Sequence, residues 1–207
     1  MMNSDFVVHI VDDEEDVRNS VAFLLTTSGH TVRVHESASA FLKLALAGDQ
    51  QNACLVTDLR MPDMSGVELL KRLRDADAML PAIVITGHGD VPMAVEAMKT
   101  GALDFIEKPF EEQVLLDAIQ RAASELKKRP RDTDDIVSIR ARLSSLTERE
   151  RQVMEGVVAG QPNKTIAYEL NISPRTVEVH RANVMAKMQV KSLPELVRLV
   201  LAVNTSA

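Results

Sequence analysis

Short apolar runs and amphipathic stretches alternate along the first part of the chain. The runs are rich in Val, Ile and Phe and are short enough for buried strands. They span residues 6–11, 31–36, 54–59, 82–87 and 103–108. Between the first two runs, one helix face is formed by Val17, Val21, Leu24 and Leu25. Five such strand–helix units predict an α/β fold, with a five-stranded parallel sheet that helices cover on both faces.

Residues 143–207 have helical periodicity throughout. Capping signals mark the ends of the expected helices. They are Thr147 with Glu150 in a capping box, Gly160, Asn163, and Ser173 with Pro174. The last expected helix carries an apolar stripe of Leu193, Leu196, Val197 and Val200. This pattern predicts a separate all-α domain of four helices.

The two patterned regions differ in charge, and a charged segment that contains a proline joins them. Residues 1–125 are strongly acidic and residues 143–207 are weakly basic, within a net charge of −6 at pH 7. This asymmetry indicates two domains with different tasks. We expect the first domain over 1–125, a linker with a helical lead-in over 126–142, and the second domain over 143–207.

Bulk features narrow the class of protein. No apolar run is long enough to span a bilayer, and the first residues lack the pattern of a secretory signal. The single cysteine, Cys54, excludes an internal disulfide and lies in an apolar run, which is typical of a core residue. We therefore expect a cytoplasmic protein with no membrane partner.

Five polar residues fall at the carboxyl ends of expected strands: Asp12, Asp13, Asp58, Thr86 and Lys108. In an open parallel sheet of order 2-1-3-4-5, ligands bind at these ends, beside strands one and three. Crowded carboxylates repel one another, and a hard cation such as Mg²⁺ relieves that repulsion. Asp58 can then accept a phosphoryl group, whose oxygens Lys108 and Thr86 can bind. A lone Asp often only caps a helix, but five polar residues at four strand ends favour a phosphoryl-transfer pocket.

Four motifs in residues 6–125 resemble the receiver domain of bacterial two-component systems: VDDEEDVR, VTDLRMPDMSGVELL, VITGHGD and DFIEKPF. The resemblance implies a flavodoxin-like (βα)5 fold with Asp58 as the phospho-acceptor. It also implies an Mg²⁺ site, a conformational switch and a cis peptide bond. The residues concerned are Asp12, Asp13, Asp58 and the Arg60 backbone carbonyl for the metal, Thr86 and Phe105 for the switch, and Lys108–Pro109 for the cis bond.

Residues 146–188 resemble a NarL/LuxR-type helix-turn-helix, and the whole chain resembles FixJ-type response regulators. On a helical wheel, Val177, Val184 and Met188 share the expected core face of the second helix of this motif. The opposite face is expected to read DNA. Expected base contacts are Arg175, Glu178, Val179 and Ala182, and expected phosphate contacts are Lys164, Thr176, Asn183 and Lys187.

The resemblance to FixJ-type regulators implies a transcription regulator and not an enzyme. In this interpretation a sensor histidine kinase, of the haem-based oxygen-sensing FixL type, phosphorylates Asp58. The phosphorylated chain then forms a homodimer, binds double-stranded promoter DNA and activates nitrogen-fixation or microaerobic genes with RNA polymerase.

Two other classes remain open from the residues themselves. A Mg²⁺-dependent phosphatase could use Asp58 as nucleophile, although Arg60 stands where haloacid-dehalogenase-like phosphatases carry a general acid. Turnover of a generic phosphomonoester would favour that class, and stoichiometric labelling would oppose it. A constitutive DNA-binding protein with an inert receiver is the second alternative, and the intact pocket argues against it.

Overall fold

The computed structural model describes residues 6–48, 52–87, 91–127 and 133–204. Contacts group the chain into two compact units, one of residues 1–88 with 100–128 and one of residues 89–99 with 129–207. None of the described helices is long and apolar enough to cross a bilayer.

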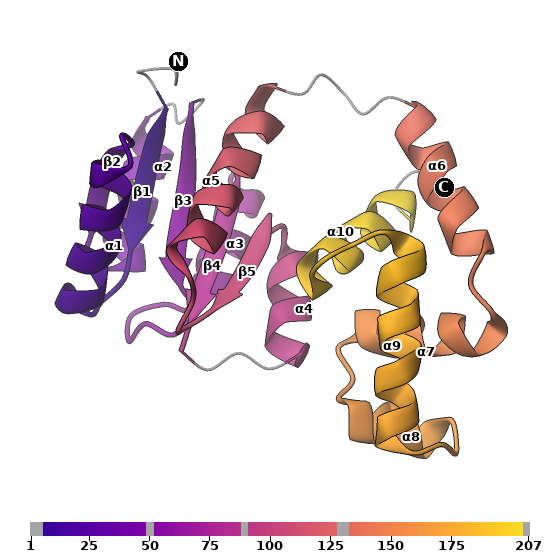
Figure 1. The fold of residues 1–207 in the computed structure, drawn as a ribbon. Coiled ribbons are helices and arrows are strands. Elements are labelled where there is room, and N and C mark those ends of the chain that lie inside the picture. The colour runs from indigo at the N-terminus through magenta and orange to yellow at the C-terminus, as the bar shows by residue number, and fades with distance from the viewer. Residues whose placement is uncertain (1–5, 49–51, 88–90, 128–132, 205–207) are drawn as a thin grey trace. The chain divides into compact units, whose positions relative to one another are not determined.

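A five-stranded parallel sheet forms the first unit, in the order β2-β1-β3-β4-β5 (Figure 1). Its strands are β1 Val7–Val11, β2 Thr31–His35, β3 Ala53–Asp58, β4 Ala82–Thr86 and β5 Asp104–Glu107. All residues of β3 and β4 are buried, which explains their continuous apolar runs. The predicted parallel sheet and its strand order are confirmed.

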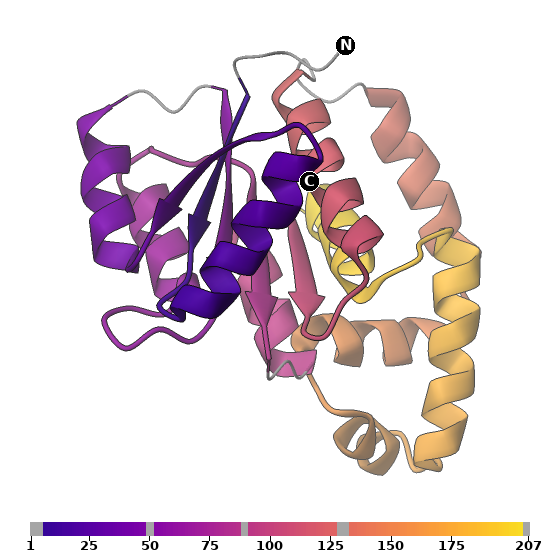
Figure 2. The same cartoon turned by 60° about the vertical axis from the view of Figure 1, so that its left-hand side comes forward.

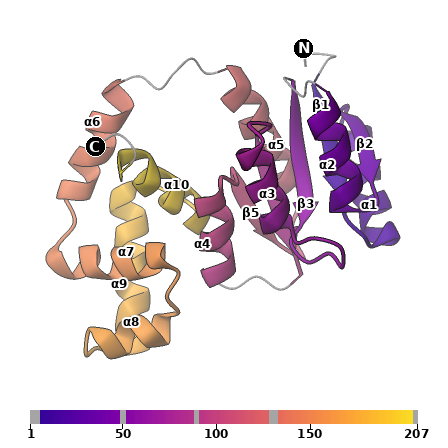
Figure 3. The ribbon, with the colours of Figure 1, turned by 180° about the vertical axis from the view of Figure 1, so that it is seen from behind.

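Helices cover both faces of this sheet. On one face lie α1 Glu15–Thr27 and α5 Glu112–Lys127, as Figures 1 and 2 show. The view from behind in Figure 3 shows α2 Ala38–Ala47 and α3 Gly66–Asp75 on the other face. The fourth helix in sequence, α4, spans Val91–Thr100.

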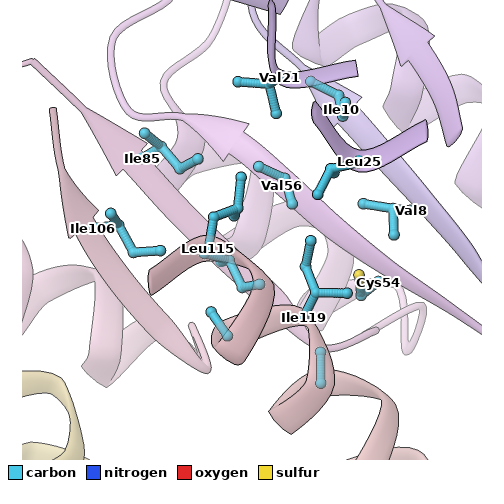
Figure 4. Close-up of a cluster of buried hydrophobic side chains, with 13 residues drawn as sticks. Val8, Ile10, Val21, Leu25, Cys54, Val56, Ile85, Ile106, Leu115 and Ile119 are labelled. Carbon is cyan, nitrogen blue, oxygen red and sulfur yellow. The ribbon is translucent and has the colours of Figure 1, made fainter. Parts of the chain in front are cut away.

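Between the sheet and the pair α1 and α5 lies a hydrophobic core (Figure 4). Val21 and Leu25 of the predicted helix face are buried in it, and Leu115 and Ile119 of α5 pack with them. Cys54 is also part of this core, and burial raises the pKa of its thiol to about 12. The thiol is therefore protonated at neutral pH, and the predicted core role of Cys54 is confirmed.

Five of the helices follow β5 and α5 in the second unit: α6 Thr133–Ser144, α7 Glu148–Ala159, α8 Asn163–Glu169, α9 Pro174–Met188 and α10 Leu193–Asn204. The predicted capping box of α7 is present, and Gly160 ends that helix with a φ of 88°. Ser173 caps α9, and Pro174 is its first residue. The predicted helices α7 to α10 are confirmed, and α6 precedes them.

The prediction that Asn163 caps α8 is wrong. The N-cap of α8 is Pro162, and no side chain caps that helix. Asn163 is the first residue of α8, and its Oδ1 accepts a hydrogen bond of 2.7 Å from Arg181 of α9. The Asn163 side chain therefore makes a tertiary contact with α9 instead of the helix cap that its position in the sequence predicts.

The helical lead-in predicted within residues 126–142 is more than a connection. Ile139 of α6 is only 7% exposed and belongs to a core that includes Met154, Val184, Met188 and Val200. The contacts of α6 with α9 and α10 make it part of the helical unit. Residues 128–132, inside the predicted linker, lie outside the described residues.

Candidate functional site

One lysine joins two buried carboxylates at the carboxyl ends of β1 and β3. The ammonium of Lys108 lies 3.1 Å from Asp12 Oδ2 and 3.0 Å from Asp58 Oδ1. The side chains of Asp12 and Asp58 are 7% and 9% exposed, which removes most of the water that would screen their repulsion. The structure thus brings together three of the residues predicted for the pocket.

The sheet explains why these residues meet. Val11 pairs with Thr57 in the parallel register, so the residues that follow them lie side by side: Asp12 just past the end of β1 and Asp58 at the end of β3. The backbone amide of Lys108 donates to the carbonyl of Thr86 at 2.7 Å, which fixes the start of the next loop beside β4. The Lys108–Pro109 peptide bond is cis, as the family resemblance implies.

Backbone amides hold the remaining carboxylate oxygens. Asp58 Oδ2 accepts from the amide of Arg60 at 2.6 Å, and Asp12 Oδ1 accepts from the amide of Glu14 at 2.9 Å. Burial alone would lower the pKa of Lys108, but Asp58 and then Asp12 outweigh that effect and raise the pKa above its ordinary value. The lysine is therefore a permanent cation between two carboxylates.

The donor chemistry of this pocket fits a magnesium ion. Mg²⁺ commonly takes one or two carboxylates and completes its shell with waters and phosphate oxygens. Asp12 and Asp58 supply two carboxylates that already share one cation, and Asp13 beside them is exposed. Among the residues that the structure describes, no group of three or more acidic, histidine or cysteine side chains converges on a metal site. The carboxylates of Asp12 and Asp58 therefore fit an ion whose other ligands include waters and phosphate oxygens.

Thr86 and Phe105 occupy neighbouring strands. Thr86 ends β4 and is 1% exposed, whereas Phe105 on β5 is half-buried. In the register, Thr86 pairs with Glu107 and Phe105 pairs with Val84, so Phe105 is two residues back from Thr86 on the adjacent strand. Their coupled movement remains a prediction.

Arg18 of α1 is a pocket residue that the sequence reasoning missed. Its Nη1 donates to the backbone carbonyl of Asp12 at 2.7 Å and reaches that of Asp13 at 3.5 Å. Arg18 therefore supports the loop that carries the acidic pair. A basic residue one turn into the helix that follows that pair was the available signal.

In the second unit, α9 presents the predicted reading face to solvent. Arg175, Glu178 and Ala182 are exposed, and Val179 is 56% exposed despite its apolar side chain. The opposite face is buried through Val177, Val184 and Met188, as the helical wheel predicts. Asn183 is also exposed.

The four predicted phosphate contacts differ in their surroundings. Lys164 and Asn183 are exposed, whereas Thr176 is half-buried and its hydroxyl bonds that of Ser173 at 2.8 Å. Lys187 donates to Glu150 Oε2 at 2.6 Å and to the carbonyl of Ser145 at 3.3 Å. Its ammonium is thus engaged within the protein.

The hydrogen bond from Lys187 also changes the pKa of Glu150. The hydrogen bond from Lys187 is the largest cause that lowers the pKa of Glu150, to about 2, and the backbone amide of Thr147 is the next. The same carboxylate therefore completes the capping box of α7 and binds the last turn of α9.

Two known protein families match successive parts of the chain. Residues 8–120 match the family described as response regulator receiver domain, and residues 144–200 match the bacterial regulatory proteins of the luxR family. The parallel sheet with its acidic pocket and the helical unit thus define a response regulator with a DNA-binding domain.

Known proteins are similar to this chain over nearly its whole length. The transcriptional regulatory protein FixJ of Rhizobium meliloti is 66% identical over 96% of this chain and 97% of its own. FixJ of Bradyrhizobium diazoefficiens is 50% identical over 93% of each chain. The crystal structure of full-length FixJ from B. japonicum is 47% identical, with a TM-score of 0.58 over 98% of this chain and 99% of that one. The chain belongs to the FixJ-type response regulators.

Proposed function

We propose that phosphorylation of Asp58 switches this regulator to its DNA-binding form. The observation that carries the proposal is the carboxylate of Asp58, which is buried at a strand end, with Oδ1 bound by the Lys108 ammonium and Oδ2 by the Arg60 amide. In the reaction, an Asp58 carboxylate oxygen forms a bond to phosphorus while the bond from phosphorus to the histidine nitrogen of a sensor kinase breaks. The kinase histidine leaves as a neutral imidazole, because its other ring nitrogen carries a proton while the phosphoryl group is attached.

The other pocket residues bind and orient the phosphoryl group. Lys108 donates to one phosphoryl oxygen and offsets part of its charge, and the Thr86 hydroxyl donates to another. Magnesium, when bound, would neutralise charge shared by the carboxylates and the phosphoryl oxygens. Its expected ligands are the Arg60 backbone carbonyl and the carboxylates of Asp12, Asp13 and Asp58.

Labelling tests this site. Asp58→Asn should abolish acid-labile, hydroxylamine-sensitive labelling by acetyl phosphate with Mg²⁺, because an amide oxygen is a far weaker nucleophile. Asp75→Asn, which changes an exposed aspartate at the end of α3, should label like the wild type. Equal labelling of the Asp58 variant would overturn the assignment, and many turnovers per protein on a phosphomonoester would favour the phosphatase class instead.

DNA recognition is proposed for the exposed face of α9 in the major groove. Arg175, Glu178, Val179 and Ala182 contact bases, because their side chains offer donors, an acceptor and apolar surface on one face. Lys164, Thr176, Asn183 and Lys187 contact phosphates; Lys187 can do so only with the donor hydrogens that Glu150 and Ser145 leave.

The 66% identity to a FixJ protein supports the biological setting of this proposal. The sensor is a haem-based, oxygen-responsive kinase of the FixL type. The targets are promoters of nitrogen-fixation or microaerobic genes, which the protein activates with RNA polymerase in the cytoplasm.

Phosphorylation is proposed to create a homodimer. An aspartyl phosphate adds up to about two negative charges and three acceptor oxygens at one point. Thr86 and Lys108 move toward it, and Phe105 turns into the space that Thr86 leaves. A two-fold dimer would place two reading helices on half-sites roughly 10 base pairs apart. Sedimentation with beryllofluoride tests this step: an activated protein that stays monomeric while it saturates its DNA site would contradict it.

A further inference from the structure

The C-terminal end of α9 is hydrogen-bonded to three earlier segments of the chain. Arg142 of α6 donates from Nη1 to the carbonyl of Met188 at 3.2 Å. Lys187 reaches back to the carbonyl of Ser145 and to Glu150, at the start of α7. The end of α9 that lies farthest from Arg175 is therefore tied to α6, to the loop after it and to α7.

Arg142 supplies what the end of a helix lacks. The last carbonyls of an α-helix have no partner within the helix, and a cation there also interacts favourably with the helix dipole. Gln189 adopts a left-handed conformation with a φ of 57°; its amide donates to the carbonyl of Ala186, and the amide of Val190 donates to that of Met185. The carbonyl of Met188 receives its bond from Arg142, 46 residues earlier in the chain.

The guanidinium of Arg142 is itself oriented. Its Nη2 donates to the Ser138 hydroxyl, one turn earlier on α6, at 3.2 Å. Ile139 anchors the same turn of α6 in the core that contains Met188. A buried apolar contact and a polar contact thus fix α6 against the end of α9.

We infer that Arg142 is a positioning residue for DNA recognition, through which α6 sets the orientation of α9 in its own domain. Direct readout of bases depends on hydrogen bonds of about 2.7–3.2 Å, so a small tilt of α9 displaces its reading face from the base edges. The inference rests on the proposed function of α9. It also gives α6 a role in recognition, although all of α6 except its last residue precedes residues 144–200, which match the luxR family.

The test compares substitutions of two arginines on α6. Arg142→Gln removes the forked cation, Arg142→Lys keeps the charge and one donor, and Arg140→Gln changes an exposed arginine on the same helix. Each full-length, beryllofluoride-activated protein is titrated with a duplex selected from random sequences by the wild type, and with the same duplex carrying one substituted base pair. Affinity is measured at several salt concentrations, below the temperature at which any variant unfolds.

Arg142→Gln should lower the discrimination between the two duplexes by roughly fivefold or more, because misplaced side chains lose base contacts. Its salt slope should equal that of the wild type, since Arg142 binds a carbonyl and not a phosphate. Arg142→Lys should restore part of the discrimination, and Arg140→Gln should retain all of it.

Two results would overturn the inference. Unchanged discrimination in Arg142→Gln would show that α9 keeps its orientation without this bond. A salt slope smaller by about one, with discrimination intact, would make Arg142 a phosphate contact. A wild type without any base preference would instead overturn the proposed function of α9, and the role of Arg142 with it.

Discussion

The two functional regions of this protein place their polar side chains in opposite environments. In the acceptor pocket, Asp12 and Asp58 are buried and share the ammonium of Lys108. On α9, Arg175 and Glu178 are exposed. Phosphoryl chemistry benefits from groups that are fixed and shielded from water before the substrate arrives, whereas a DNA-reading face must be free to meet base edges. Rigidity in the helical unit therefore comes from contacts behind the reading face.

The contribution of α6 to the helical unit should give the largest change in stability. Ile139→Ala removes a side chain that is 7% exposed in the core with Met188 and Val200. We expect a loss of about 2–5 kcal/mol in the unfolding free energy of this unit. The matched change Val137→Ala, at a position 63% exposed on the same helix, should shift it by less than about 0.5 kcal/mol. Hydrogen exchange of α6 and α9 amides measures the change in unfolding free energy for each variant. Equal changes for the two variants would contradict the packing of α6 in this core.

Base reading should give the next largest effect. Arg175→Ala should reduce discrimination at one base pair by about 1–3 kcal/mol, because a bidentate contact to a base is lost. Lys164→Ala should weaken all duplexes alike and reduce the salt slope by about one. Binding titrations on single-substituted duplexes at several salt concentrations separate the two. Similar behaviour of both variants would refute the division into base and phosphate contacts.

Substitution of Lys108 should separate the phosphorylation of Asp58 from the DNA-binding response to it. Lys108→Ala should still label at Asp58, more slowly, because the nucleophile remains. It should respond poorly in DNA binding, because no cation is drawn toward the phosphoryl group. Labelling rate and DNA affinity are measured on the same preparations. Normal activation of DNA binding by a labelled Lys108→Ala protein would contradict this role.

Glu150 should contribute the smallest, pH-dependent effect. Its folded-state pKa of about 2 is below the ordinary value of 4.5, so its stabilisation is complete above pH 4.5 and is lost as the pH falls toward 2. Glu150→Gln should therefore destabilise the helical unit at pH 6 and differ little from the wild type near pH 2. Exposed Glu148→Gln is the control. Hydrogen exchange of α7 amides across this range reports the difference, and a gap that is independent of pH would argue against the ion pair with Lys187.

The sequence predicted most of the fold because its signals are local. Strand runs, the capping box of Thr147 and Glu150 and the Ser173–Pro174 start of α9 each depend on neighbouring residues, and each is confirmed. The pocket was also predictable, because parallel strands bring their carboxyl ends together and so place Asp12 beside Asp58.

Contacts between distant segments were beyond such reasoning. Asn163 has the spacing of a cap but binds Arg181, 18 residues later. Lys187 lies on the flank of a helical wheel, yet its ammonium holds Glu150, 37 residues earlier. The bond between Arg142 and Met188 joins segments that the sequence pattern had assigned to a linker and to a domain. These pairings are set by tertiary packing, which periodicity does not encode.

The measurement that tests the central claim most directly is the DNA affinity of the full-length protein with and without beryllofluoride and Mg²⁺, beside Asp58→Asn treated in the same way. Allosteric coupling in proteins commonly changes affinity by roughly 5–150-fold. The account predicts tightening within that range for the wild type and none for the variant. Equal affinity of the treated and untreated wild type would contradict the claim that Asp58 controls DNA binding.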